Sequence, residues 1–86
     1  MYKLNYYSKS IADNANKEQK FEYDGEGETF RLRRNAVNYL FDIVQNEYKV
    51  LGYATEKRVG GLYCYKSIKT AEGNRKMIEI LIKVEK

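Results

Sequence analysis

The chain contains no histidine, no tryptophan and no proline, and its only cysteine is Cys64. Most familiar catalytic sites need a histidine, a cysteine beside a base, or a cluster of metal ligands. With no histidine and one cysteine, only carboxylates remain as a set of metal ligands. We therefore expect no catalytic residues, no metal site and no cofactor. The composition favours a binding protein over an enzyme.

Aromatic rings and positive charge are what the chain does contain. It has nine tyrosines and 16 lysines plus arginines in 86 residues. Tyrosine is amphipathic and is common where a protein holds a partner. The net charge of +4 suits an anionic partner. A chain of this length predicts a single domain, 1–86, whose small core is compatible with a homodimer.

Long apolar runs are also missing. The longest strongly apolar run is Ile80-Leu81-Ile82, far short of a membrane span. The first ten residues lack the apolar stretch of a secretory signal. A lone cysteine cannot form an intramolecular disulfide, which favours a reducing cytosol. Because the composition is also typical of AT-rich coding, we expect a cytoplasmic protein of a bacterial host with no membrane partner.

The charge is unevenly distributed along the chain. Residues 1–28 carry four lysines against six acidic residues, a net charge of −2. Residues 49–86 carry nine basic residues against four acidic ones, a net charge of +5. Uneven charge can mark a working surface. The basic C-terminal half is therefore the first candidate for contact with a partner.

The first 33 residues predict strands and a loop. Residues 2–8 are rich in aromatic and mixed polar side chains, as a strand often is. Residues 12–19 are polar and predict a loop or a frayed helical turn. Residues 20–33 predict two short strands around a glycine-rich turn at 24–27, with aromatic residues alternating on both sides of it.

One helix is expected at residues 35–47, where Asn35 can cap the first turn. A buried stripe at helical spacing is predicted for the apolar residues Val37, Leu40, Phe41, Val44 and Tyr48. The opposite side is expected to carry the polar residues Asn38, Asp42 and Gln45. A helix with one such stripe should lie across a sheet.

The remainder predicts a three-stranded meander, with strands at 49–56, 62–69 and 77–85. Glycines at 60, 61 and 73 allow the turns between these strands. The fold class is therefore α+β: a single helix packed on a mainly antiparallel sheet of about four to six strands, with the meander at its C-terminal end.

The second meander strand is the most suggestive segment, because alternation places Tyr63 and Tyr65 on one face. Aromatic rings on a sheet, with cations at its rim, stack single-stranded bases in several folds. Alternatively, the two tyrosines cover the helix-facing core with their hydroxyls at its edge. The register of the neighbouring strands decides between the two faces. The residues expected to contact a partner or nucleic acid here are Lys57, Arg58, Tyr63, Tyr65, Lys66, Lys69 and Arg75.

A second basic cluster, Arg31, Arg33 and Arg34, comes just before the expected helix. Its guanidiniums could clamp phosphates or a partner's carboxylates. Alternatively, it is a solvated cluster balanced by the acidic residues Glu22, Asp24, Glu26 and Glu28. The acidic residues lack the spacing of a calcium loop, so a solvated turn is predicted. Cys64 has no histidine to activate it and is expected to be a buried structural residue.

The order of strand, polar segment, helix and basic meander loosely resembles the ribosome-dependent mRNA-cleaving toxins of bacterial toxin–antitoxin pairs. The resemblance covers roughly half of the chain. It implies cleavage that relies on arginine, lysine and tyrosine, with the candidate carriers Arg58, Tyr63, Tyr65, Lys66 and Lys69. The strands expected at 20–33 depart from it, since those toxins have a helix there.

In its small size, lack of catalytic groups and composition, the chain resembles accessory proteins of phages and mobile elements. These include inhibitors of host defence, such as anti-CRISPR and anti-restriction proteins, which act by occupying a functional surface. Our hypothesis is a non-enzymatic inhibitor of a host nucleoprotein. Its partner would be a nucleic-acid-handling protein of the host, or nucleic acid itself. The alternatives are a direct DNA- or RNA-binding accessory protein and an mRNA interferase.

Overall fold

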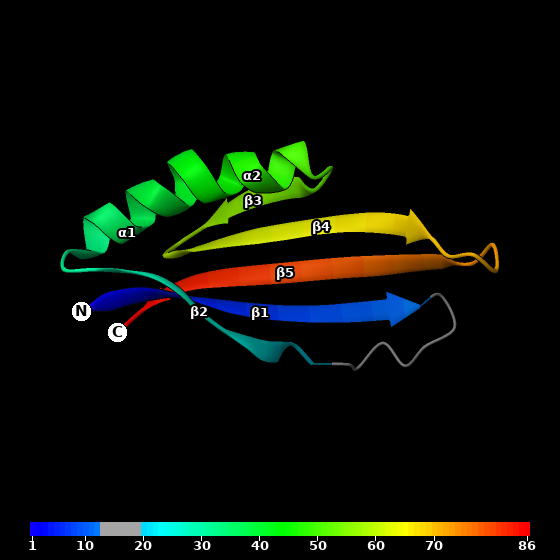
Figure 1. The fold of residues 1–86 in the computed structure, drawn as a ribbon, viewed down its shortest axis with the longest axis horizontal. Helices are drawn as coiled ribbons and strands as arrows, with labels where there is room; N and C mark the ends of the chain where they lie inside the picture. Colours follow the sequence, from blue (N-terminus) through cyan, green and yellow to red (C-terminus); the bar gives the residue numbers. More distant parts are fainter. Residues whose placement is uncertain (13–19) are drawn as a thin grey trace.

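The structure, a computed structural model, describes residues 1–12 and 20–86. Apart from residue 12, the loop or helical turn expected at residues 12–19 lies outside the described residues. Five antiparallel strands form one sheet in the order β2-β1-β5-β4-β3 (Figure 1). Their bounds are Tyr2–Ala12 (β1), Glu22–Phe30 (β2), Ala54–Arg58 (β3), Gly61–Lys69 (β4) and Arg75–Glu85 (β5).

A single continuous helix lies across this sheet (Figure 1). It consists of α1 (Arg33–Tyr39), a π-helical turn η1 (Leu40–Val44) and α2 (Gln45–Val50). The first part contacts β1 and β2, the π turn contacts β4, and the last part contacts β3. The helix therefore crosses one face of the sheet from one edge to the other. The expected fold class, with its C-terminal meander β3-β4-β5, is confirmed.

The core lies between the helix and this face of the sheet. The sheet contributes the buried side chains Leu4, Leu62, Cys64 and Ile82. The helix contributes the buried side chains Ala36, Leu40 and Val44. In β5, strand alternation places the apolar residues Ile78, Ile80, Ile82 and Val84 on the helix side. The expected burial of Cys64 is confirmed.

The helix begins and ends differently from the prediction. It begins at Arg33, and Leu32, in an extended conformation, occupies the N-cap position without a side-chain hydrogen bond. The predicted cap, Asn35, was wrong: its backbone N–H bonds to the Leu32 carbonyl. At the other end the helix continues past Glu47 to Val50, and a glycine two residues later ends it. Gly52 has φ +91°, and its N–H bonds to the carbonyl of Lys49.

The late end of the helix shortens the next strand. The sequence predicted a strand at 49–56, whereas β3 covers only Ala54–Arg58. Besides the Gly52 bond, the N–H of Tyr53 bonds to the carbonyl of Tyr48. This pair of bonds is a Schellman motif, which satisfies the last carbonyls of the helix and turns the chain back towards the sheet.

Gln45 faces the sheet, although the sequence predicted that it would face solvent. Its side chain is only 8% exposed, and its backbone N–H bonds to the carbonyl of Leu40, five residues earlier. Such a π turn adds one residue to the helical turn and rotates the rest of the helix about its axis. Val44 and Gln45 are therefore both buried. The Gln45 amide donates to the Thr55 hydroxyl at 2.9 Å, which satisfies its buried polar group.

Residues 20–33 do not form two strands around a turn, so that prediction was wrong. They form one edge strand, β2, whose pairing with β1 is interrupted by two register shifts. Each shift accommodates one extra residue of β2, as a β-bulge does. Gly25, at φ +128°, supplies the conformation that one bulge needs. Gly27 leaves room for the Tyr6 ring, since a Cβ at this position would lie 2.6 Å from that ring.

Truncating the centre of the helix stripe should destabilise the fold. Leu40 is fully buried, so Leu40→Ala should lower the free energy of unfolding by about 2–5 kcal/mol. Ile43 is 45% exposed and serves as the matched control; Ile43→Ala should change that free energy by about 0.5 kcal/mol or less. Denaturant unfolding followed by circular dichroism measures both. Equal effects of the two substitutions would contradict the assigned helix face.

Candidate functional site

The sheet has a second face, opposite the helix, which we call the open face. Within residues 1–12 and 20–86, no helix lies on it. Successive side chains of a strand point to opposite faces. Since Leu4, Leu62 and Ile82 point to the helix, the odd-numbered residues of β4 and β5, and those of β1 from Lys3 to Lys9, point to the open face.

Three tyrosines and one leucine form a single row across the open face. Tyr63 of β4 pairs with Leu81 of β5, which pairs with Tyr7 of β1, which pairs with Tyr23 of β2. We call these four residues the tyrosine row. Tyr65 lies beside the row, its ring stacked on that of Tyr63 with centroids 5.3 Å apart and planes at 28°. The sequence could not decide which face of the sheet Tyr63 and Tyr65 occupy. In the structure both lie on the open face.

Hydrogen bonds at the ring edges hold the tyrosine row in place. The Tyr7 hydroxyl donates to Glu85 at 2.7 Å, and the Tyr23 hydroxyl donates to the Asn5 side-chain oxygen at 3.3 Å. The Tyr63 hydroxyl donates to Glu79. Burial, together with this bond to Glu79, raises the pKa of Tyr63 to about 12. At neutral pH the Tyr63 ring is therefore uncharged, and the hydrogen bonds orient all three rings of the row.

Cations lie over two of these rings. The Arg58 guanidinium is 4.5 Å from the centroid of the Tyr63 ring, and the Lys83 amine is 5.3 Å from that of Tyr7. Lys9 forms an ion pair with Glu79 at 3.6 Å. The open face therefore offers aromatic surface with positive charge directly beside it, which suits a ligand with both flat rings and negative charge.

The structure divides the candidate residues of the meander between two sides of the sheet. Lys57 and Lys66 are on the helix side. The Lys57 amine lies 5.1 Å from the Phe41 ring centroid, and the Lys66 amine donates to the Leu51 carbonyl at 3.1 Å. Strand alternation places the other five candidates on the open face: Arg58, Tyr63, Tyr65, Lys69 and Arg75. Of the five residues suggested by the resemblance to mRNA-cleaving toxins, Lys66 is on the helix side, away from the other four.

The second basic cluster is exposed at the start of the helix. Arg31 precedes α1, and Arg33 and Arg34 occupy its first turn. None of the ion pairs formed by the described residues joins these arginines to the acidic residues of β2. Arg33 instead reaches the turn between β3 and β4, where its guanidinium packs against Gly60. The structure thus brings Arg33 close to the first turn of the meander, although the two are far apart in the sequence.

Four residues of the open face were missed by the sequence analysis: Tyr7, Tyr23, Lys9 and Lys83. Tyr7 lies within a strand that was expected, but its face depends on how β1 pairs with β5. Tyr23 was assigned to a hairpin that does not form. Tyrosine spacing alone gave no sign that strands from both ends of the chain would bring these rings together.

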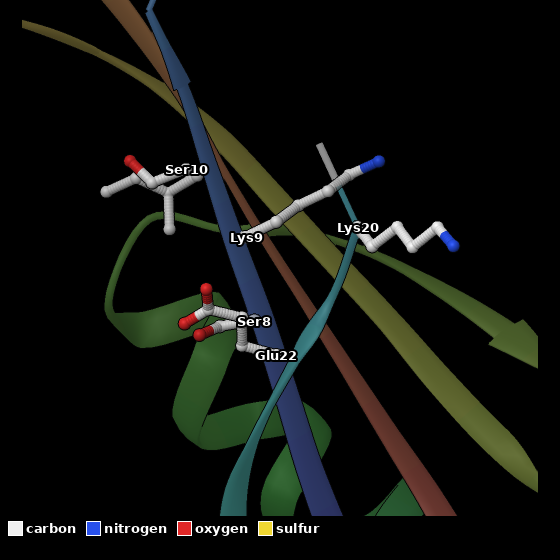
Figure 2. Close-up of a pocket in the computed structure, with 6 residues that line it drawn as sticks. Ser8, Lys9, Ser10, Lys20 and Glu22 are labelled. Atoms are coloured by element: carbon white, nitrogen blue, oxygen red, sulfur yellow. The ribbon is translucent and has the colours of Figure 1, made fainter. Parts of the chain in front are cut away.

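A different hollow, of about 240 Å³, lies between the end of β1 and the start of β2. Figure 2 shows that Lys9 and Lys20 point to one side of β1, whereas Ser10 lies on the other side. The polar groups of this hollow therefore do not converge on one point. Elsewhere, burial raises the pKa of the Cys64 thiol to about 11, so this thiol is protonated and unreactive at neutral pH.

The described residues contain no group of three or more cysteine, aspartate or glutamate side chains arranged to hold a metal ion. They also contain no helix long and apolar enough to cross a membrane. No protein-family model, curated protein or solved structure that was compared with the chain matches it. The class of the protein is therefore given by its geometry alone: an α+β domain in which no described helix covers one tyrosine-rich face of the sheet.

The raised pKa of Tyr63 predicts a loss of stability at alkaline pH. Its pKa is about 12 in the folded protein and about 10 in an unfolded chain, so folding favours the neutral phenol. The stabilisation is complete below pH 10 and should disappear as pH rises from about 10 to about 12. Unfolding free energies measured between pH 9 and 12 should fall less steeply in Tyr63→Phe than in the wild type. Parallel curves for the two proteins would show that Tyr63 is not held as described.

Proposed function

We propose that the protein is a non-enzymatic, cytoplasmic binding protein that holds single-stranded nucleic acid on its open face. The observation that carries this proposal is the tyrosine row, in which three oriented rings and Leu81 cross four strands, with cations over two of the rings. Sheets that expose aromatic rings in this way bind unpaired bases by stacking, while nearby cations take the phosphates.

Stacking would supply most of the affinity. Each base stacked on an aromatic ring contributes about 1–3 kcal/mol. Arg58 and Lys83 lie over Tyr63 and Tyr7 in the free protein, so a base that takes the ring face moves the cation towards a phosphate. Because any base offers a flat ring, binding by this route tolerates many sequences.

The charge of the open face sets how strongly salt should weaken binding. Six cations project from it: Lys3, Lys9, Arg58, Lys69, Arg75 and Lys83. Four carboxylates project beside them: Glu26, Glu56, Glu79 and Glu85. The net charge is therefore only +2. We expect a shallow salt dependence, in which few counterions are released.

A matched pair of substitutions tests whether positive charge on the open face contributes to binding. Arg58 and Lys57 are neighbours in β3 that point to opposite sides of the sheet. Arg58→Gln should weaken binding of a fluorescent oligothymidine and reduce the salt slope by about 0.7, the value for one phosphate of a single strand. Lys57→Gln should bind like the wild type. Fluorescence anisotropy at several salt concentrations measures both, and equal losses would mean that the open face is not the binding surface.

A second pair tests the rings. Tyr65 is 38% exposed on the open face, and Tyr53 lies on the helix side, where the Lys66 amine covers its ring. Tyr65→Leu should weaken oligothymidine binding roughly fivefold or more, the equivalent of about 1 kcal/mol, because a leucine cannot stack on a base. Tyr53→Leu should not change it. Unchanged binding by Tyr65→Leu, with folding verified by circular dichroism, would contradict base stacking at this end of the face.

A second candidate function has its own observation in the acidic edge of the sheet. By acidic edge we mean the exposed side chains of the free edge strand β2, Glu22, Asp24, Glu26 and Glu28. Two register shifts interrupt the alternation of β2, so Glu22 points to the helix side and Glu26 to the open face, and the carboxylates give this edge negative charge on both sides. Exposed negative charge of this kind is comparable to that of a nucleic-acid backbone. It supports an inhibitor that occupies the basic groove of a host nucleoprotein, as anti-CRISPR or anti-restriction proteins would.

Charge reversal separates this candidate from the first. The double variant Glu22→Lys with Asp24→Lys should lose affinity for a host nucleic-acid-handling protein that the wild type retains in a pull-down. Glu72→Lys, in the exposed turn between β4 and β5, is the control and should retain that protein. Retention of the same protein by the double variant would exclude the acidic edge as the inhibitory surface.

A further inference from the structure

A hollow of about 380 Å³ lies at the end of the sheet where the β3–β4 turn meets the start of the helix. Figure 1 shows that both chain termini lie near this end, while the β4–β5 turn lies at the opposite end. Three cations from three separate elements line the hollow: Arg33 of α1, Arg58 of β3 and Lys83 of β5. Residues 50 positions apart in the sequence thus meet around one space.

The β3–β4 turn is shaped to admit Arg33. Gly60 has φ +64° and no side chain, and a Cβ at this position would lie 2.7 Å from the Arg33 Nη2 atom. The guanidinium therefore packs where any other residue would place a side-chain carbon. The Gly60 carbonyl accepts a hydrogen bond from the Val84 N–H at 2.9 Å, which ties the turn to β5. The walls of the hollow are consequently held by backbone contacts.

Two of the three cations have no carboxylate of their own. In the part of the chain that the structure describes, Arg33 and Lys83 form no ion pair, and Arg58 has only a long contact of 3.7 Å with exposed Glu56. Glu85 also lines the hollow, but its Oε1 accepts hydrogen bonds from Tyr7 and Asn5. These bonds lower the pKa of Glu85, which stays ionised. Three cations and one carboxylate give the lining a net charge of +2.

We propose that this hollow binds a phosphate monoester at the end of a nucleic-acid strand that lies on the open face. A monoester carries a charge of about −1.5 to −2 at pH 7, which matches the lining, whereas a phosphodiester carries a single charge. Guanidiniums bind phosphate oxygens in bidentate fashion, and Arg33 and Arg58 provide two of them. The inference rests on the proposed function for the identity of the strand, but not for the phosphate site itself.

The hollow adjoins the tyrosine row, so a nucleic-acid strand that lies along the row can place its end in the hollow. Leu81 belongs to the row and also lines the hollow. Arg58 lines the hollow and lies over the Tyr63 ring. A strand whose bases stack along the row can thus place its terminal phosphate among the three cations. The protein would then distinguish strand ends and not only unpaired bases.

Three oligothymidines test this inference by fluorescence anisotropy: one with a 5′-phosphate, one with a 3′-phosphate and one with hydroxyls at both ends. One of the two phosphorylated strands should bind about tenfold more tightly than the hydroxyl strand, or tighter still, as even one added charge-assisted hydrogen bond would give. Arg33→Gln should abolish that preference and leave affinity for the hydroxyl strand unchanged. Arg34→Gln, one residue along the same helix and outside the hollow, is the matched control and should keep the preference.

A second measurement keeps the inference separate from the proposed function. Thymidine 5′-monophosphate and 3′-monophosphate, titrated into labelled protein, should shift the amide resonances of Gly60 and Gly61 in the wild type but not in Arg33→Gln. If the oligothymidines do not bind but these shifts occur, the phosphate site stands and the proposed function fails. If the oligothymidines bind with no preference for a phosphate, or the resonance shifts are absent, the phosphate site is refuted. Binding on the open face is then judged separately, by the substitutions of Arg58 and Tyr65.

Discussion

The pairing of β1 with β5 is the constraint on which the rest of the structure depends. It joins strands from the two ends of the chain through ten consecutive residue pairs, from Lys3–Glu85 to Ala12–Lys76. A slip of one residue would turn Leu4 or Ile82 away from the helix and expose it. Because these side chains are fully buried, the register is fixed by the core. The same register fixes what projects from the other face, where Tyr7 is aligned with Leu81.

One helix can cover only one face of a five-stranded sheet, so the composition of the second face has to tolerate water. Tyrosine meets this requirement because its ring contributes apolar contact while its hydroxyl finds a polar partner. Tyr7 and Tyr63 do so through Glu85 and Glu79. The open face therefore combines hydrogen-bonded hydroxyl groups with exposed aromatic surface, such as the rings of Tyr23 and Tyr65. This arrangement accounts for four of the nine tyrosines, Tyr7, Tyr23, Tyr63 and Tyr65.

The sequence was sufficient for features that depend on local periodicity and insufficient for those that depend on strand pairing. The helix stripe around Leu40 can be derived from spacing alone, and Leu40 and Val44 are buried as predicted. The burial of Gln45 against the sheet could not be predicted, because it results from a π-helical turn that no residue type predicts. Likewise, Gly25 was taken for a hairpin turn because glycine suits both a turn and a bulge; the long partner strand β1 decided for the bulge.

The positions of the charged side chains could not be derived from the sequence for the same reason, since they depend on strand pairing. Counted along the sequence, the basic residues of the meander form one group, yet the neighbours Lys57 and Arg58 lie on opposite sides of the sheet. Arg33 and Lys83, which belong to different groups in the sequence, line the same hollow. The electrostatic field that an anion meets depends on distances in space and not on separation along the chain. A net charge per segment therefore does not locate a charged surface; the sheet register and the glycine turn at Gly60 determine that three cations line one hollow.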